Sequence, residues 1–458
     1  MIQEYAATLG VKVEVIRFAL CLFAAFPISA LYNFIPSNQI QIKHLYSIIT
    51  SGIITCVVFS TSSFLQLAVQ VLLIYYTNVF FAKYKFGPLL GFGIALAHMS
   101  WIHAEAQIWR ENDPTFVDYS AMMMVLLIKM SSFSYCVHDG TRKESELDSY
   151  QKEYRIINMP SLIEFMGYSF FFNGYWVGPA IEFRHYQRFI NQEGEYKNIP
   201  STVGPMLKAL VLGLVMIVLE TVVGKHYHFA LTTSEFFFEK TLFQKLLYIN
   251  IAGLFVRAKF HSVWKISEAS ALVSGVGYAV TNGKERFDAA ENVDVYAVEF
   301  AENPKMAMDG WNKYTANWLR RYVYVRVRQS WLKLPLTFFI SAFWHGFYPG
   351  YYLSFLWSVP LMQAGRAVRK HLRPVFIQGT LAPYKKVYDA IGFFATLFSL
   401  NFLYMPFILR TMSSSFEIWK SMYFIGILLP IVVQVSLTTF GLGKFIRRAF
   451  IPLDKKTQ

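Results

Sequence analysis

The chain has 458 residues, of which 55% are hydrophobic and only 16% are charged, and its mean hydropathy is +0.35. A typical soluble domain carries about 25% charged residues, and one water-facing core cannot bury this much apolar surface. The composition therefore excludes an ordinary soluble protein and predicts an integral membrane protein whose outer face is covered by lipid.

The net charge is +14, from 43 Lys and Arg against 29 Asp and Glu. In a membrane protein such an excess is typical of loops that face the anionic cytoplasmic leaflet, so we predict no nucleic-acid partner. The cysteines Cys21, Cys56 and Cys136 form no CxxC pair, and they indicate neither a zinc site nor a disulfide framework. We expect no metal and no other bound cofactor.

Membrane-spanning helices need about 20 mostly apolar residues each. Runs of this kind begin near Val15, Leu45, Phe64, Phe86, Tyr119, Val203, Leu242, Glu268, Leu336, Leu353, Val387 and Trp419. Because several runs are short or broken, they predict about eleven transmembrane helices. The expected fold is an all-α polytopic domain over residues 1–458, with re-entrant and interfacial helices that enclose a catalytic tunnel.

The N-terminal run, near Val13 to Phe34, has no small-residue cleavage site and is expected to be retained as a span. Further along, Gly174, Gly178 and Pro179 interrupt an apolar stretch and indicate a broken or re-entrant element. No internal repeat is visible, so an inverted-repeat transporter has no support in the sequence.

Residues 282–333 combine many Lys and Arg with frequent Trp and Tyr, which is not the composition of a disordered segment. One set of side chains recurs there at helical spacing: Trp311, Thr315, Trp318 and Tyr322. The other face of the same helix would carry Lys313, Asn317, Arg320 and Arg321. This division predicts an amphipathic helix at the membrane interface.

Two polar residues are candidates for chemistry. His345 lies in an apolar run, where an ionisable group is costly to bury, and a neutral imidazole can act as a general base. Gly346, Pro349 and Gly350 follow and end the helix, which leaves room for a substrate. Asn312 carries an amide that can stabilise the oxyanion of acyl transfer. The alternatives are a structural histidine and an N-cap or loop asparagine.

Trp311-Asn312 and the later Trp344-His345-Gly346 resemble the active-site motifs of the membrane-bound O-acyltransferase family. The longer matches resemble its lysophospholipid acyltransferase branch, above all the Pro-Gly-Tyr-Tyr sequence after the histidine. The similar blocks are Gly178 to Tyr186, Phe255 to Tyr278, Asn303 to Leu319 and Ser341 to Phe355. They define a motif-bearing core at about residues 168–355.

The resemblance implies an acyl-CoA donor, a lysophospholipid acceptor and transfer to the free hydroxyl, at sn-2, in phospholipid remodelling. It maps the family's catalytic histidine onto His345 and its asparagine onto Asn312. His345 would take the hydroxyl proton as the oxygen attacks the thioester, while Asn312 would hold the carbonyl or the acceptor. Alternatives are a protein or sterol O-acyltransferase of the same superfamily, or, from other classes, a transporter or a lipid-binding scaffold.

Further site residues are expected around this pair. CoA carries phosphates, so its candidate contacts are the cations near Asn312, each of which can equally serve membrane topology: Lys305, Lys313, Arg320, Arg321 and Arg326. The candidate substrate-binding residues are Trp311, Trp344, Tyr348, Tyr351, Tyr352 and Glu268. Glu268 lies in an apolar run and needs a cationic partner such as Arg257, Lys259 or Lys265, so structural support of the tunnel is its alternative role.

The last four residues, Lys455-Lys456-Thr457-Gln458, resemble the dilysine retrieval signal of endoplasmic-reticulum membrane proteins, which must face the cytosol. We therefore expect a multi-pass protein of the endoplasmic-reticulum membrane with a cytosolic tail at 446–458. A homo-oligomer is left open.

Overall fold

The computed structural model of the protein describes Glu4, residues 13–113 and residues 116–451. Within these residues the chain is mostly helical. Its one sheet is a hairpin in which β1 (Ala279–Thr281) pairs antiparallel with β2 (Lys284–Arg286). The predicted all-α class is confirmed. The chain divides into two compact units, which are described separately.

The first unit comprises the described residues up to Met216 together with Phe260–Asn292 and Lys313–Tyr322. It begins with long apolar helices: α2 (Val13–Tyr32), α3 (Ile40–Val58), α4 (Thr61–Phe81), α5 (Gly87–Ala104) with the π-helical turn η1 (Glu105–Trp109), and α6 (Ser120–Gly140). Shorter elements follow: η2 (Glu144–Glu146), α7 (Ser149–Tyr154), α8 (Leu162–Ser169), α9 (Phe183–Ile190) and η3 (Gly194–Lys197). The hairpin and most of α10 (Val203–Val218), the end of α12 (Leu242–Ser274), α15 (Lys313–Trp318) and most of the π-helix η7 (Leu319–Tyr324) complete the unit.

Helix α6 forms the centre of this unit, because nearly all of its side chains from Met122 to Val137 are buried. Phe133 packs against Phe165 of α8 and Phe183 of α9, with ring centroids 4.4 and 5.2 Å apart. Buried Lys129 donates to the backbone carbonyls of Tyr168 and Ser169 at 2.5 and 3.2 Å, which supplies the partners that a buried ammonium requires.

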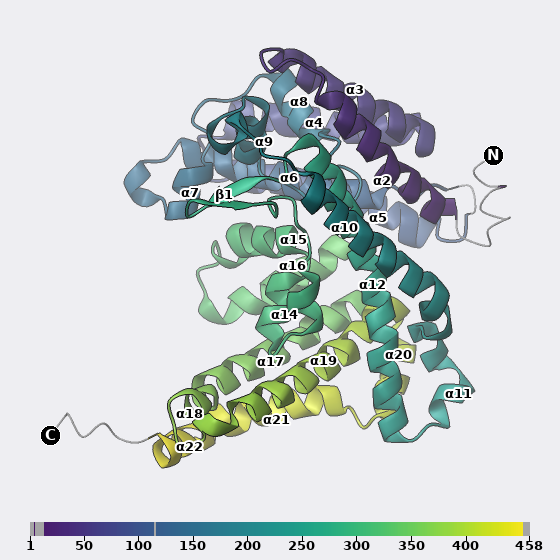
Figure 1. The fold of residues 1–458 in the computed structure, drawn as a ribbon, viewed down its shortest axis with the longest axis vertical. Coiled ribbons are helices and arrows are strands. Elements are labelled where there is room, and N and C mark those ends of the chain that lie inside the picture. Colours follow the sequence, from purple (N-terminus) through teal and green to yellow (C-terminus); the bar gives the residue numbers. More distant parts are fainter. Residues whose placement is uncertain (1–3, 5–12, 114–115, 452–458) are drawn as a thin grey trace. The chain divides into compact units, whose positions relative to one another are not determined.

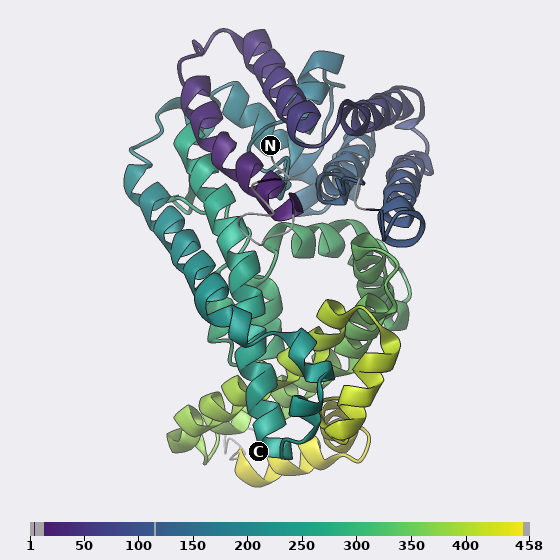
Figure 2. The same ribbon diagram turned by 90° about the vertical axis from the view of Figure 1, so that its right-hand side faces the viewer.

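Two teal helices of the first unit, α10 and the end of α12, lie side by side (Figure 2). Gly213 of α10 makes this approach possible, since a Cβ there would meet a side-chain carbon of Ile266 at 2.8 Å. The predicted break in the chain at Gly174, Gly178 and Pro179 is confirmed, because residues between α8 and α9 form turns and extended chain rather than a helix.

The second unit comprises Ile217–Lys259, Val293–Asn312 and the described residues from Val323 onward. Its shorter elements are η4 (Leu219–Val223), η5 (Gly224–His226), η6 (Phe229–Thr233), α11 (Glu235–Phe238), α13 (Val295–Glu299), α14 (Pro304–Gly310), α18 (Arg373–Ile377) and η8 (Ala382–Tyr384). Its longer helices are the first part of α12, α16 (Ser330–His345), α17 (Pro349–His371), α19 (Lys385–Leu409), α20 (Met412–Ser421), α21 (Ile425–Thr438) and α22 (Leu442–Phe450).

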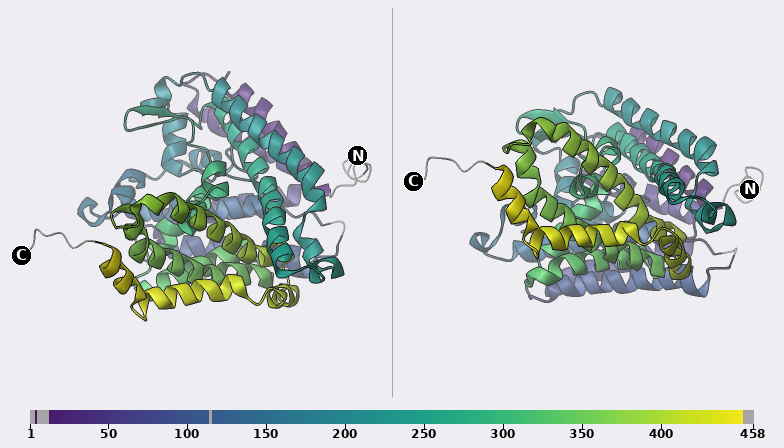
Figure 3. Two further views of the ribbon diagram at one scale, coloured as in Figure 1. Left: turned by 60° about the horizontal axis from the view of Figure 1, so that its bottom comes forward. Right: turned by 90° about the horizontal axis from the view of Figure 1, so that it is seen from below.

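Helices α17, α19 and α21 pack against one another and form the body of the second unit (Figure 3). Their core contains Phe402 of α19, whose ring stacks on that of Trp419 of α20 with centroids 5.5 Å apart. Buried polar contacts also link α12, α13 and α19 within this unit. Arg257 donates to both carboxylate oxygens of Glu299 at 2.8 and 2.7 Å and also contacts the Asn401 amide oxygen.

Among the described helices, six are long and apolar enough to cross a membrane, or up to seven if the bent pair α20 and α21 counts as one span. The protein is therefore a multi-pass membrane protein, but the predicted count of about eleven spans is not confirmed. The runs predicted to begin near Leu242 and Glu268 are a single 33-residue helix, α12, because no Gly-Pro break separates them. Its charged residues, Lys245, Arg257, Lys259, Lys265 and Glu268, keep it outside the six.

The predicted N-terminal span is confirmed as helix α2, of which Val15–Tyr32 is one of the six candidate spans. At the other end of the chain, residues 446–450 of the expected tail form the end of helix α22. The dilysine sequence lies outside the described residues.

Candidate active site

His345 is the last residue of α16, and the helix ends there because Gly346 adopts a φ of +119°, which side-chain-bearing residues rarely tolerate. Proline at position 349 then starts α17. The partly buried imidazole is enclosed by aromatic rings. It stacks on Phe355 at 5.2 Å between centroids and meets the rings of Phe407 and Tyr351 at 4.8 and 5.9 Å.

Of the substrate-binding residues predicted near the histidine, Trp344 and Tyr351 contact its ring, at 4.7 and 5.9 Å. The ring of Tyr348 lies against Tyr351, and Tyr352 packs on Phe339 of α16. Phe355 and Phe407 are not among the predicted site residues. Phe355 follows Tyr351 by four positions and so shares its helix face. This spacing could have been used to predict Phe355 as a site residue. Phe407 comes from α19 and has no local motif.

The sequence after His345 has a packing role that the structure makes plain. The backbone N–H of Gly350 donates to the carbonyl of Arg410 at 2.8 Å, so the start of α17 is bonded to the end of α19. A Cβ at Gly350 would lie 2.1 Å from the Pro406 carbonyl oxygen. Glycine is therefore required for the close approach that brings Phe407 to the imidazole.

Asn312 lies between α14 and α15. Asn303 caps the N-terminus of α14 by accepting from the backbone N–H of Met306 at 3.1 Å, and Pro304 occupies the first turn. The helix ends at Trp311, and Asn312 then takes a φ of +43°, in the left-handed region that asparagine tolerates better than most residues. This conformation turns the chain away from the axis of α14.

A continuous series of ring contacts joins His345 to Trp311, the residue before Asn312, within the second unit. The Trp311 ring meets Tyr404 edge-on at 6.2 Å, Tyr404 stacks on Phe407 at 5.2 Å, and Phe407 contacts His345. Tyr404 and Phe407 are three positions apart on α19 and share a face. Helix α19 thus brings the segment that carries Asn312 and the end of α16 to one aromatic surface.

The predicted amphipathic helix from Trp311 to Tyr322 is only partly correct. Thr315, Trp318 and Tyr322 are buried and Asn317 and Arg320 are exposed, as the spacing indicates. However, the segment consists of a short α-helix, α15, followed by the π-helix η7, and Trp311 precedes both. Trp318 donates its indole N–H to Ser131 of buried α6 at 2.8 Å, so this face packs on protein in the first unit.

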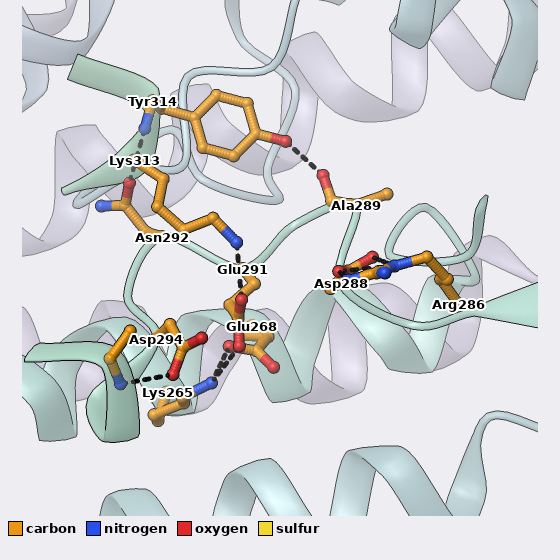
Figure 4. A network of polar contacts seen from close by, with 11 residues as sticks. Lys265, Glu268, Arg286, Asp288, Ala289, Glu291, Asn292, Asp294, Lys313 and Tyr314 are labelled. Carbon is orange, nitrogen blue, oxygen red and sulfur yellow. Dashed lines mark hydrogen bonds and ion pairs between the residues drawn. The ribbon is translucent and has the colours of Figure 1, made fainter. Parts of the chain in front are cut away.

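Glu268 has the cationic partner that its apolar surroundings require. Lys265 bridges it, at 2.8 Å, to Glu291 at 3.0 Å, and Glu291 also accepts from Lys313 at 2.6 Å (Figure 4). The positive charges of Lys265 and Lys313 therefore neutralise the negative charges of Glu268 and Glu291 within the first unit. Asn292 fixes the start of α15 beside them, because its backbone and side-chain oxygens accept from the N–H groups of Lys313 and Tyr314.

Next to this network the first unit contains a pocket of about 180 Å³. Its lining includes Tyr314, Trp318, the imidazole of His185, and charged side chains of both signs: Glu182, Asp288, Glu291, Lys313 and Arg321. Two of the five predicted CoA-binding cations, Lys313 and Arg321, thus share one pocket. Of the others, Lys305 is exposed and paired with Asp309, and Arg320 is exposed.

The carboxylate of Glu182 holds Arg321 in this pocket. It accepts from the hydroxyls of Tyr150 at 2.7 Å and Tyr322 at 3.3 Å, and Arg321 lies 3.5 Å away with its guanidinium over the Tyr150 ring. Burial raises the pKa of Glu182, against the opposing effect of these donors. Burial lowers the pKa of His185 to about 4, so this histidine is neutral near pH 7 and bonds to the Val276 carbonyl and the Tyr196 hydroxyl.

No group of three or more His, Cys, Asp or Glu side chains suited to a metal ion occurs among the residues that the structure describes. The second unit offers an imidazole in an aromatic surround and a carboxamide at Asn312. The first unit contains a pocket lined by both cations and carboxylates.

Comparison with known proteins identifies the class of this multi-pass helical membrane protein. A model of the membrane-bound O-acyltransferase family matches residues 104–406. The chain belongs to the membrane-bound O-acyltransferase family and is an O-acyltransferase.

Three relatives are similar over most of their length. A lysophospholipid acyltransferase of Schizosaccharomyces pombe is 31% identical, over 96% of this chain and 88% of the relative. One of Saccharomyces cerevisiae is 30% identical, over 91% and 72%. Lysophospholipid acyltransferase 2 of Arabidopsis thaliana is 32% identical, over 94% of each chain. The family predicted from the sequence motifs is thereby confirmed.

The contact at Gly350 can be tested by Gly350→Ala. The added methyl would force α17 away from α19, so we expect thermal unfolding to begin a few degrees lower and activity to fall by about 10- to 100-fold. Gly365→Ala, on the same helix, is the control, because its Cβ would meet only Pro304 at 3.5 Å, an ordinary contact. Equal effects of the two substitutions would contradict a specific role for Gly350.

Proposed function

We propose that the protein transfers a fatty acyl chain from acyl-CoA to the free sn-2 hydroxyl of a lysophospholipid. The observation that carries this proposal is His345 at the break between α16 and α17, ringed by Trp344, Tyr351, Phe355 and Phe407. The names of the relatives support the lysophospholipid as acceptor.

The reaction needs one base and one site for the developing negative charge. His345 removes the proton of the lysolipid hydroxyl as its oxygen attacks the thioester carbonyl. The carbon–sulfur bond then breaks, and the departing CoA thiolate takes the proton back from the imidazolium. The amide of Asn312 donates to the carbonyl oxygen while it carries negative charge.

The aromatic rings around His345 contribute in two ways. They leave little room for water, which would otherwise hydrolyse the thioester. They also restrict the imidazole to a narrow range of orientations, since Phe355 stacks on its face and Phe407 meets it edge-on. Holding the base in the reactive orientation raises the effective concentration of the reacting groups.

The phosphates of acyl-CoA would bind at cations near Asn312. Among the candidates we favour Lys313, which directly follows Asn312 in the chain, and Arg321, because both line the pocket of the first unit. Glu291 and Glu182 pair with these two cations in the first unit. Lys305, Arg320 and Arg326 are further candidates. The reaction requires no metal and no cofactor beyond the CoA thioester.

We also propose that α5, α12, α16 and α17 enter the membrane in addition to the seven candidate spans, which would give about eleven membrane helices. The positive-inside tendency favours a cytosolic C-terminus, and the dilysine sequence favours the endoplasmic reticulum. Trp311, Tyr348 and Tyr352 are proposed to line the substrate tunnel with the rings around His345 in the second unit. A role of Glu268 in substrate binding stays a prediction.

The acceptor and the base are tested together by CoA release from purified protein with oleoyl-CoA and a panel of lysophospholipids. We expect turnover with at least one 1-acyl lysolipid and a loss of about 10²- to 10⁴-fold in His345→Ala. His226→Ala, at an exposed histidine, is the control and should keep full activity. Turnover only with a sterol or peptide acceptor would refute the phospholipid assignment, and an active His345→Ala would refute the base.

Asn312 allows its backbone and side-chain roles to be separated. Asn312→Gly keeps the left-handed conformation and removes the amide, whereas Asn312→Ala also strains the backbone. If the amide stabilises the oxyanion, both variants lose about 10²-fold or more in kcat, and only Asn312→Ala loses thermal stability as well. An active Asn312→Gly enzyme would show that the residue serves the turn alone.

The proposed CoA contacts predict a change in KM. Lys313→Gln and Arg321→Gln remove a charge but keep a hydrogen-bond donor, and each should raise KM for acyl-CoA by about tenfold with a smaller effect on kcat. The KM for the lysolipid should change little. Lys284→Gln, on the exposed β2 strand, is the matched control. An unchanged KM for acyl-CoA in both variants would show that CoA does not bind at these two residues.

A further inference from the structure

A dense group of cations gathers at one end of the second unit, away from the residues used above. It consists of eight exposed Lys and Arg side chains on four elements: Arg366, Arg369 and Lys370 of α17, Arg373 of α18, Lys386 of α19, and Lys444, Arg447 and Arg448 of α22. We call this group the basic end. In Figure 1 these elements meet where the labels α18 and α22 stand.

The elements of the basic end are packed together. Gly443 of α22 lies against His371, the last residue of α17, so closely that a Cβ there would come within 2.4 Å of the imidazole ring. The backbone N–H of Thr380, beyond α18, donates to the carbonyl of Phe450 at 2.8 Å. Helix α18 also contacts α19 and α22. The eight cations therefore belong to one surface.

The protein supplies almost no negative charge to this surface. From Pro349 to Ile451 the chain contains only two acidic residues, Asp389 and Glu417. Asp389 is paired with a ninth cation, Lys385. Glu302 approaches the same helix, since its backbone carbonyl faces Gly392. None of the eight cations forms an ion pair with any residue that the structure describes. Like charges held together repel, so the surface favours an anionic partner.

Large apolar side chains are exposed among the cations. On α22, Leu442, Phe445, Ile446 and Ala449 follow helical spacing along one face, and Lys444, Arg447 and Arg448 occupy the other. Phe445 is 67% exposed, and Phe440, just before the helix, is 79% exposed. This division is typical of a helix that lies in the interface of a bilayer with its cations among the headgroups.

The position of the basic end along the chain favours the same partner. Helix α19 begins there, within the candidate span Ala382–Leu409, and α22 directly follows α21 of the bent candidate span. The ends of membrane-spanning helices lie at headgroup depth. A lipid surface is consequently in reach, whereas a soluble anionic protein would have to displace headgroups to reach the same cations.

We propose that the basic end binds the headgroups of anionic phospholipids in the leaflet that it faces. The lipid phosphates and carboxylates supply the counter-charges that the chain lacks, and the apolar face of α22 enters the acyl region beside them. This binding is independent of acyl transfer and of the proposed acceptor. It would anchor the ends of α17 and α19 that lie opposite the residues around His345.

The test uses the full-length protein, reconstituted in vesicles of phosphatidylcholine with about 30 mol% phosphatidylserine and then extracted into neutral detergent. Native mass spectrometry counts the lipids that remain bound. We expect phosphatidylserine to be retained about tenfold more than phosphatidylcholine, relative to the vesicle composition, and high salt during extraction to reduce this enrichment.

Two variants remove four charges each. Arg369→Gln, Lys370→Gln, Arg447→Gln and Arg448→Gln, combined, should reduce the enrichment to about twofold or less. The matched control combines Lys143→Gln, Lys152→Gln, Lys197→Gln and Lys284→Gln, four exposed lysines of the first unit, and should keep the enrichment. Circular dichroism and acyltransferase activity in detergent report whether both variants are folded.

Four results would overturn the proposal. The first is equal retention of the two lipids by the wild type. The second is full enrichment in the variant of the basic end. The third is an equal loss in both variants, which would assign the effect to net charge alone. Release of phosphatidylserine by millimolar inorganic phosphate would show that the surface recognises free phosphate rather than a membrane, and would also overturn it.

Discussion

A polar group that enters a lipid-facing protein must find its partner inside the chain, because the hydrocarbon around it offers none. Buried Lys129 meets this constraint with two backbone carbonyls that become available where the chain breaks after α8. Arg257 meets it with Glu299 and Asn401. The buried polar contacts thus connect helices that hydrophobic packing alone would leave free to slide.

The same constraint shapes the surroundings of the candidate site. Lys313 and Lys265 are balanced by Glu291 and Glu268, so the segment after Asn312 is tied by charge to α12 within the first unit. In the second unit, His345 has a mainly aromatic surround. The chain therefore keeps charged side chains near the pocket of the first unit and aromatic side chains around the imidazole of the second.

Helix α19 connects the parts of the second unit. At its C-terminal end, Tyr404 and Phe407 contact Trp311 and His345, and the carbonyl of Arg410 bonds Gly350. At its other end it begins within the basic end, where the cations have no internal partners among the described residues. Unpaired charge is tolerated there because this surface is outside the apolar core and can be matched by solvent or lipid headgroups.

The sequence by itself determined the membrane class, the helical fold and the family. Composition is a global property that needs no contacts, and the motifs around Asn312 and His345 are local in the chain. The break at Gly174, Gly178 and Pro179 was predictable for the same reason, since glycine and proline act on the backbone directly. The roles of Asn312 and His345 remain predictions that rest on the resemblance.

Only the tertiary structure decided which residues meet. Phe407 reaches His345 because Gly350 lets α17 approach α19, and no local pattern on α19 indicates that contact. Two further outcomes likewise depend on helix packing: the choice of Lys265 among three possible partners of Glu268, and the presence of Lys313 and Arg321 in one pocket. The expected amphipathic helix became α15 and η7. Periodicity records which side chains share a face, but the length and register of a helix are set by what that face packs against.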